Sequence, residues 1–193
     1  MPTVGAIVLA AGFSRRFGSV KLNARLPGGH SVLEQSLLKL QASAVSDIIV
    51  AGRQELAALG CYDCMLQLRK PCRLVITEHS ELGMGHSLAE AAKVIPEHWG
   101  AALVCLADMP YINPQTVDKL IKHSRSDRII VPVYQEHRGH PVCFGADFFL
   151  EIANSQGDSG ARHVLGRHVT RTETLEVDDP GIIKDIDRPG DLE

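Results

Sequence analysis

The sequence contains no long hydrophobic run. None of its apolar stretches approaches the roughly 20 uncharged residues of a transmembrane helix. The N-terminus also lacks the basic region, long apolar run and cleavage site of a secretory signal. We therefore expect a soluble, cytoplasmic protein with no membrane partner.

An excess of charge of one sign is also missing. The chain has 20 Lys and Arg against 23 Asp and Glu, a formal net charge of -3. This balance gives no general attraction to nucleic acid, so a basic binding site must be local. We expect no nucleic-acid partner.

Cysteines are few and odd in number. Five cysteines make no even disulfide framework, which fits a reducing compartment. Cys61 and Cys64 form a C-x-x-C pair that Cys72 and His79 could extend to four metal ligands, but the spacing is not that of a zinc knuckle. We interpret this segment as an insert whose cysteines hold no metal.

Apolar runs alternate with helical patterns along the chain. With 193 residues, 45% of them hydrophobic, this alternation predicts a single domain over residues 1–193. The predicted class is α/β, a three-layer sandwich with a mostly parallel sheet. Strands are expected at 4–10, 47–52, 73–77, 101–107, 128–133, 140–145 and near 172–177. Helices are expected at 31–40, 86–95, 113–123, 146–153 and 159–165, with a short one between residues 52 and 73.

Two helix starts carry clear signals. Ser31 and Glu34 have the spacing of a capping box. Asn113 followed by Pro114 has the pattern of an N-cap residue and a first helical residue. Both helices therefore have defined N-termini.

The most unusual loops follow predicted strands, at 11–21, 78–85 and 108–110. Ligands of parallel sheets bind at the carboxyl ends of strands. The first loop, within LAAGFSRRFGSVK (9–21), fails both the G-x-x-x-x-G-K-[ST] and the G-x-G-x-x-G patterns. Its glycines and cations still predict a polyphosphate cradle, with a solvated basic loop as the alternative.

This loop resembles the L-A-[AG]-G-x-S-x-R-M-G-x-x-K signature of the MobA-like nucleotidyltransferases. Further blocks are similar to the family in the same order: GMGHSL (83–88), LADMP (106–110), RGHPVCF (138–144), GDSGARHVL (157–165) and DIDRPGDL (185–192). Ala11 and the R-G-H-P and G-D-x-G-A-R blocks resemble the MocA branch, the molybdenum cofactor cytidylyltransferases. The resemblance implies a Rossmann-like nucleotide-diphospho-sugar transferase fold, with about 1–110 for the nucleotide and about 111–193 for the acceptor.

The resemblance also implies a reaction. CMP passes from CTP to the phosphate of molybdenum-bound molybdopterin and pyrophosphate leaves, with Mg²⁺ or Mn²⁺ as cofactor and a molybdoenzyme apoprotein as a further partner. Because the attacking phosphate is already an anion, it needs no general base. Positioning and charge neutralisation then dominate catalysis.

Site residues follow from the matched blocks. The resemblance implies catalytic roles for Arg16, Lys21 and Asp108. It implies nucleotide contacts from Leu9, Ala10, Ala11, Gly12, Ser14, Arg15, Arg16, Gly18, Lys21, Gly83, Met84 and Ser87. It implies acceptor contacts from His140, Asp158, Gly160 and Arg162. The implied metal ligands are Asp108 and Asp187, with Asp185 as the substitute for Asp187.

Structural alternatives exist for several of these residues. Asp108 could form a turn, and Asp187 could cap a helix beginning at Pro189. Gly85 and His86 replace two hydroxyl residues of the relatives, and His86 suits either substrate contact or exposure to solvent.

Two alternative functions remain open. The same fold could act on GTP or on another phosphorylated acceptor. The chain could also be a non-catalytic carrier of molybdenum cofactor, although Lys21 and Asp108 favour an enzyme.

Overall fold

The structure is a computed structural model that describes residues 2–14 and 17–192. Its strands are β1 (Thr3–Leu9), β2 (Ile48–Gly52), β3 (Cys72–Ile76), β4 (Trp99–Leu106), β5 (Ile129–Tyr134), β6 (His137–Arg138), β7 (Val142–Gly145) and β8 (Thr172–Glu176). Its α-helices are α1 (Val32–Gln41), α2 (Gln54–Ala58), α3 (Met84–Ala92), α4 (Pro114–His123), α5 (Phe149–Ile152) and α6 (Arg162–Arg167). The 3₁₀ turns include η1 (Lys21–Asn23), η2 (Asp63–Gln67), η3 (Ser80–Leu82), η5 (Gly157–Ser159) and η8 (Pro189–Leu192).

The strands of the described residues form one sheet in the order β3-β2-β1-β4-β7-β5-β6, and β8 pairs with β5. β1 is parallel to β2 and β4, and β2 is parallel to β3. β7 is antiparallel to both of its neighbours, β4 and β5. The prediction of an α/β fold with a mostly parallel sheet is confirmed, and β6 and β7 are its antiparallel exceptions, since β6 is antiparallel to β5 as well.

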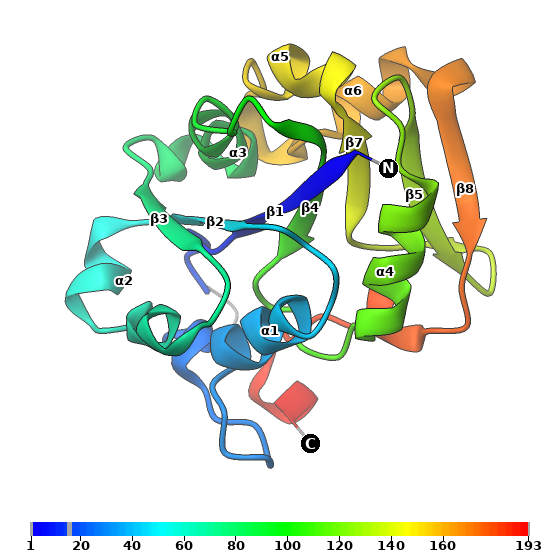
Figure 1. Ribbon diagram of the computed structural model, residues 1–193. Helices are drawn as coiled ribbons and strands as arrows, with labels where there is room; N and C mark the ends of the chain where they lie inside the picture. Colours follow the sequence, from blue (N-terminus) through cyan, green and yellow to red (C-terminus); the bar gives the residue numbers. More distant parts are fainter. Residues whose placement is uncertain (1, 15–16, 193) are drawn as a thin grey trace.

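Helices cover both faces of the sheet, which gives the three predicted layers (Figure 1). On one face, α1 and α4 bury side chains such as Leu33, Leu37 and Leu120 against the sheet. On the other face, α3, α5 and α6 bury side chains such as Leu88 and Ile152. Burying one such side chain stabilises the fold by about 1.5–3 kcal/mol. The sheet is therefore held by two cores.

The capping signals act as predicted. The Ser31 hydroxyl accepts from the Glu34 amide at 3.1 Å, and the Glu34 carboxylate accepts from the Ser31 amide at 3.2 Å. Asn113 accepts from the Gln115 amide at 3.2 Å, with Pro114 as the first residue of α4. These bonds satisfy amide groups that a helix N-terminus leaves without intrahelical partners.

Some predicted elements differ from the structure. The helix expected at 159–165 begins at Arg162, because Gly160 has a φ of 55°, outside the helical region. The strand expected at 140–145 is preceded by β6, which the sequence analysis missed. Gln135 and Glu136 link β5 to β6 with φ of 46° and 67°, the conformation of a tight hairpin turn. That hairpin reverses the chain and makes β7 antiparallel.

The Trp99 side chain leaves no room for a side chain at Gly5. A Cβ atom on Gly5 would overlap the indole ring of Trp99. We expect Gly5→Ala to lower the free energy of unfolding by about 1–3 kcal/mol, as overpacking does. Gly166→Ala in α6 is the control, since its Cβ would meet no atom within 4 Å. Urea unfolding tests both variants, and a Gly5→Ala protein as stable as the wild type would contradict this packing.

Candidate active site

The candidate site lies where β1 and β4 end. These strands are parallel neighbours, with Leu9 opposite Leu106, so the loops that follow them leave the same edge of the sheet. Asp108 lies two residues beyond β4. The predicted first and third loops thus meet at one place.

Three carboxylates gather beside this edge. Ligand oxygens of Asp108, Asp185 and Asp187 lie within 4.8 Å of one another. The Ile186 amide donates to the Asp108 carbonyl at 2.9 Å, and the Ile186 side chain is fully buried against Phe17 and other apolar residues. Packing at Ile186 therefore carries the neighbouring aspartates from the C-terminal segment to the end of β4.

Lys21 links two of these carboxylates. Its Nζ donates to Asp108 Oδ2 at 2.7 Å and to Asp187 Oδ1 at 3.2 Å. Burial disfavours the ammonium charge, but attraction to Asp108 and Asp187 outweighs burial and raises the pKa of Lys21. Lys21 is therefore a fixed cation at neutral pH, placed between the predicted metal ligands.

The carboxylate group fits a divalent metal ion. Asp108 Oδ1 is buried and accepts no hydrogen bond from the described residues. A buried carboxylate oxygen without a donor is costly unless a cation or other donor meets it. Oxygen ligands are those that Mg²⁺ and Mn²⁺ prefer. Asp108, Asp185 and Asp187 could hold such an ion together.

A cavity of about 350 Å³ opens next to Asp108. Predicted nucleotide contacts that line it are Leu9, Ala11, Gly12, Gly83, Met84 and Ser87. It is also lined by Phe13, Ser80 and Glu81, which the sequence analysis did not select. Phe13 occupies an unspecified position of the first-loop signature, and Ser80 and Glu81 lie in the loop at 78–85 without matching a motif, so only the fold identifies them as lining residues.

Other predicted nucleotide contacts lie elsewhere. Ala10 is buried, and neither Ser14 nor Gly18 lines the cavity. The Ser14 hydroxyl accepts from the Lys21 amide at 3.3 Å, so Ser14 supports the loop. Arg15 and Arg16 lie outside the described residues.

The loop before α3 is locked to the segment around η5. Gly83 has a φ of 117°, and a Cβ there would lie 2.5 Å from Asp158 Oδ1 and from the Gly157 carbonyl carbon and oxygen. The His86 Nδ1 atom accepts from the Gly157 amide at 3.2 Å. His86 therefore has a structural bond, and Asp158 is brought to the nucleotide-side cavity.

A second cavity of about 540 Å³ adjoins the first. All four predicted acceptor contacts line it: His140, Asp158, Gly160 and Arg162. Its other lining residues include apolar side chains such as Val104 and Phe144, and Arg138. Leu9, Met84, Leu106 and Asp158 belong to both cavities. The two cavities therefore share a wall.

His140 is a neutral polar group in the larger cavity. Burial lowers its pKa, although the Val104 backbone and Asp108 act in the opposite direction. Its Nδ1 atom is buried with no hydrogen-bond partner among the described residues. An uncharged imidazole nitrogen is thus available to bond a molecule bound there.

In the part of the chain that the structure describes, Cys61, Cys64, Cys72 and His79 are not brought together as a cluster of possible metal ligands. Among the described residues, the only cluster of His, Cys, Asp and Glu close enough to share an ion is the aspartate group. Burial raises the pKa of Cys64 to about 11 and that of Cys72 to about 12. These thiols are therefore protonated at neutral pH. A protonated thiol is a poor metal ligand and a poor nucleophile.

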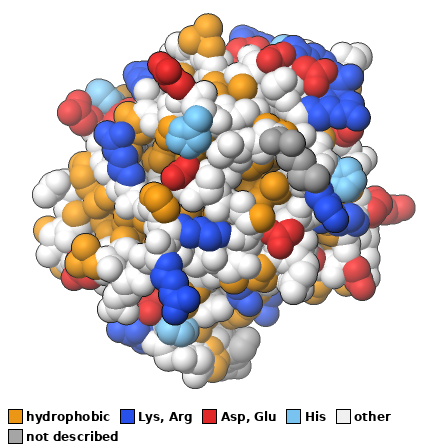
Figure 2. Space-filling view, in the orientation of Figure 1, with side chains coloured by type: hydrophobic (Ala, Val, Ile, Leu, Met, Phe, Trp, Pro, Cys, Tyr) orange, Lys and Arg blue, Asp and Glu red, His pale blue; other side chains and the backbone are white. Residues whose placement is uncertain are grey.

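The exterior agrees with the balanced composition. Figure 2 shows cationic and anionic side chains interspersed over one face. None of the described helices is both long and apolar enough to cross a membrane.

Residues 6–172 match the MobA-like NTP transferase domain. The chain belongs to this family. It is 28% identical to the purine catabolism protein PucB of Bacillus subtilis over 194 residues. The aligned region covers 97% of this chain and 93% of that protein. A probable molybdenum cofactor guanylyltransferase of Thermococcus sibiricus is 26% identical over 167 residues, 84% of this chain and 78% of that protein.

Solved structures share the fold of this MobA-like protein. The Rv0371c homologue from Mycobacterium sp. strain JC1 has a TM-score of 0.79 at 25% identity, covering 99% of this chain and 94% of that one. Rv0371c of Mycobacterium tuberculosis, solved as a complex with manganese, has a TM-score of 0.73 at 21% identity, covering 91% and 88%. The MobA-like chain is accordingly a nucleotidyltransferase by family.

Lys21 and a metal ion compete for the same carboxylates in this arrangement. We expect Lys21→Met to bind Mn²⁺ about tenfold more tightly than the wild type without nucleotide, a difference of about 1.4 kcal/mol. Titration followed by electron paramagnetic resonance measures free Mn²⁺. Asp108→Asn should weaken binding and Lys122→Met, on the exposed face of α4, should leave it unchanged. Equal affinity of Lys21→Met and wild type would contradict the competition.

Proposed function

We propose that this MobA-like protein is a cytidylyltransferase that transfers CMP from CTP to the phosphate of molybdenum-bound molybdopterin. The observation that carries the proposal is the pair of adjoining cavities, with Asp108 and the other carboxylates beside the smaller one. One cavity can take a nucleotide and the other an acceptor, so that two phosphates meet at the shared wall. In this proposal, residues of about 1–110 mainly bind the nucleotide and residues of about 111–193 mainly bind the acceptor.

Lys21 and the first loop neutralise the nucleotide in this proposal. The triphosphate takes the ammonium of Lys21 away from Asp108 and Asp187, and Arg16, with Arg15 as a weaker contributor, adds positive charge. An acceptor phosphate oxygen forms a bond to the α-phosphorus, the bond to the bridging oxygen breaks, and pyrophosphate leaves. No proton must be removed from the nucleophile, so the protein contributes orientation and charge.

Asp108, Asp185 and Asp187 would hold Mg²⁺ or Mn²⁺. When bound, the ion supplies positive charge to phosphate oxygens. Freed from Lys21, both Asp108 oxygens become available to a cation. The Rv0371c structure in complex with manganese supports a divalent ion in this fold.

The larger cavity suits an acceptor that has an apolar part and carries a phosphate. Its floor includes Val104 and Phe144, while Arg138, His140 and Arg162 supply donors and acceptors. Arg pairs with phosphate through parallel N–H groups. The product passes to a molybdoenzyme apoprotein in this proposal, and the site of action is the cytoplasm.

GTP is the main competing nucleotide. A relative of this chain bears the name probable molybdenum cofactor guanylyltransferase. Ala11 and the R-G-H-P block at 138–141 favour CTP through their resemblance to the cytidylyl branch. The same contacts serve a guanylyltransferase, so the nucleotide must be determined directly.

Pyrophosphate release decides among these functions. We expect release with CTP, and not with GTP or ATP, when the protein is given magnesium and molybdenum-bound molybdopterin. Release with GTP would move the protein to the guanylyl branch and contradict the CTP assignment. Nucleotide binding without release would favour a carrier.

Lys21 and Asp108 provide the test of mechanism. We expect Lys21→Ala and Asp108→Asn each to lower kcat by about 10²–10³, because each removes preorganised charge at the reacting phosphates. Lys122→Ala is the matched control on the exposed face of α4. Steady-state kinetics and thermal unfolding should be measured together. Near-normal turnover in a folded Lys21→Ala protein would overturn its role.

A further inference from the structure

We propose that the cysteine-containing insert positions the wall of the nucleotide cavity through Tyr62 and Arg53, which together place Phe13 for contact with the nucleobase. Tyr62 and Arg53 are positioning residues in this proposal and Phe13 is the contact residue. The inference rests on the proposed function, since it requires a nucleotide in the smaller cavity.

The Tyr62 hydroxyl ties two strand ends together. It donates to the Ala10 carbonyl at 3.0 Å and accepts from the Arg53 amide at 3.0 Å. Ala10 is the first residue after β1, and Arg53 is the first residue after β2. One hydroxyl therefore fixes the start of the predicted phosphate loop relative to the neighbouring strand.

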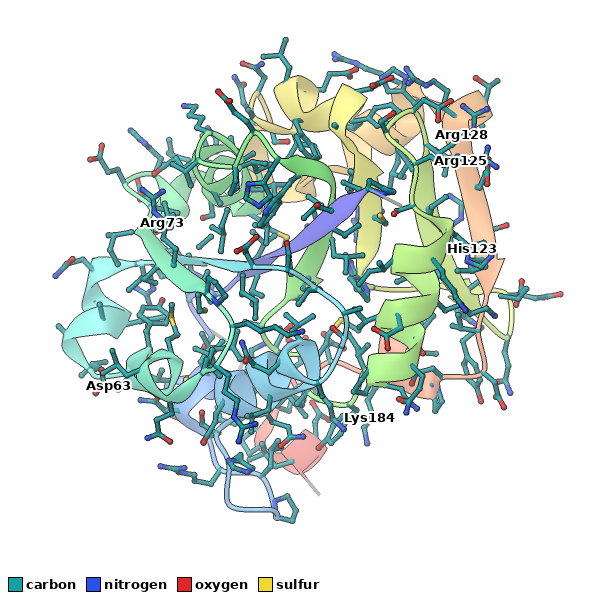
Figure 3. All side chains as sticks on the ribbon, viewed as in Figure 1. Asp63, Arg73, His123, Arg125, Arg128 and Lys184 are labelled. Atoms are coloured by element: carbon teal, nitrogen blue, oxygen red, sulfur yellow. The ribbon has the colours of Figure 1, made fainter. Side chains whose placement is uncertain are left out.

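The Tyr62 ring is built into the fold. Its side chain is buried, and a Cβ on Gly52 would lie 2.6 Å from the ring atom Cζ and 2.7 Å from the hydroxyl oxygen. Figure 3 labels Asp63, the next residue, at the edge of the molecule beside α2. The insert thus reaches from the periphery to the ends of β1 and β2 with a single side chain.

Arg53 carries this constraint to the cavity. Its guanidinium carbon lies 4.3 Å from the centre of the Phe13 ring, a cation–π contact. Only 15% of the Arg53 side chain is exposed, and its Nε atom is buried with no hydrogen-bond partner among the described residues. Its Nη1 atom also lies 3.5 Å from Oε2 of the exposed Glu55 carboxylate, so an ion pair and stacking on Phe13 together hold the guanidinium.

Phe13 is the residue that Tyr62 and Arg53 position at the cavity. It lines the cavity of about 350 Å³, as do Gly12 and Asp108. Phe13 is 40% exposed, although it lies next to the proposed site for highly charged phosphates. An aromatic ring there is suited to a planar base, and stacking accepts any base. Phe13 would therefore raise affinity for nucleotides without choosing among them.

Direct nucleotide binding tests the inference. Isothermal titration with CTP, GTP and ATP in the presence of Mg²⁺ measures affinity without the acceptor. We expect Tyr62→Phe and Arg53→Met each to raise the dissociation constant of the bound nucleotide about fivefold. The double variant should have about the same dissociation constant as either single variant, because both residues act through Phe13.

Ser124→Ala is the matched control. The Ser124 hydroxyl is also buried and donates to a carbonyl, that of Ile121 at 2.7 Å, at the far end of α4. Its loss removes one buried bond and should leave nucleotide affinity unchanged. If Tyr62→Phe does not fold, Arg53→Met carries the test, since Arg53 makes no backbone bond through its side chain in the described residues.

The outcomes separate two failures. A wild-type protein that binds no nucleotide would overturn the proposed function. A wild-type protein that binds nucleotide, with Tyr62→Phe and Arg53→Met binding equally well, would overturn only the positioning role. Additive effects of the two variants, or equal weakening by Ser124→Ala, would also overturn it.

Discussion

The repulsion among three aspartates is the constraint on which this site depends. Asp108, Asp185 and Asp187 offer oxygens within 4.8 Å of one another. Two like charges about 4 Å apart repel by about 4 kcal/mol at the effective permittivity of a partly buried site. Offsetting this repulsion requires a cation or solvent near the carboxylates. Lys21 meets this requirement in the structure and gives a reason for a lysine at the end of the first loop.

The fold brings both the aspartates and the loop that carries Lys21 to the same place. Parallel pairing of β1 and β4 brings Asp108 and the first loop to one edge, and burial of Ile186 adds the C-terminal aspartates. The site is therefore assembled from segments far apart in sequence. Its negative charge makes it selective for partners that bring positive charge with them, as a metal-bound polyphosphate does.

Local signals made part of this architecture predictable. Uniformly apolar runs such as 4–10 require a strand buried on both faces, and Ser31 with Glu34 supplies the capping bonds of a helix start. The β5–β6 hairpin was missed because Gln135 and Glu136 adopt positive φ without the glycine or asparagine that usually marks such a turn. Element boundaries elsewhere shifted by a few residues.

The site was predictable where chemistry follows a motif and not where it depends on contacts across the fold. Lys21, Asp108 and the acceptor residues lie in recognisable blocks, and the structure brings them to the two cavities or the carboxylate group. No sequence pattern relates Tyr62 to Ala10 or Arg53 to Phe13. Those pairs arise from the register of β1 and β2 and from the path of the insert.

The close contact at Gly83 couples the shapes of the two cavities in this chain. Its backbone lies against Gly157 and Asp158, and Asp158 lines both cavities. The C-terminal half consequently cannot be replaced without affecting the loop at Gly83. A replacement half with a bulkier turn at 157–158 would displace Gly83 and reshape the neighbouring nucleotide cavity. A change of shape on one side of this contact therefore requires a compensating change on the other side.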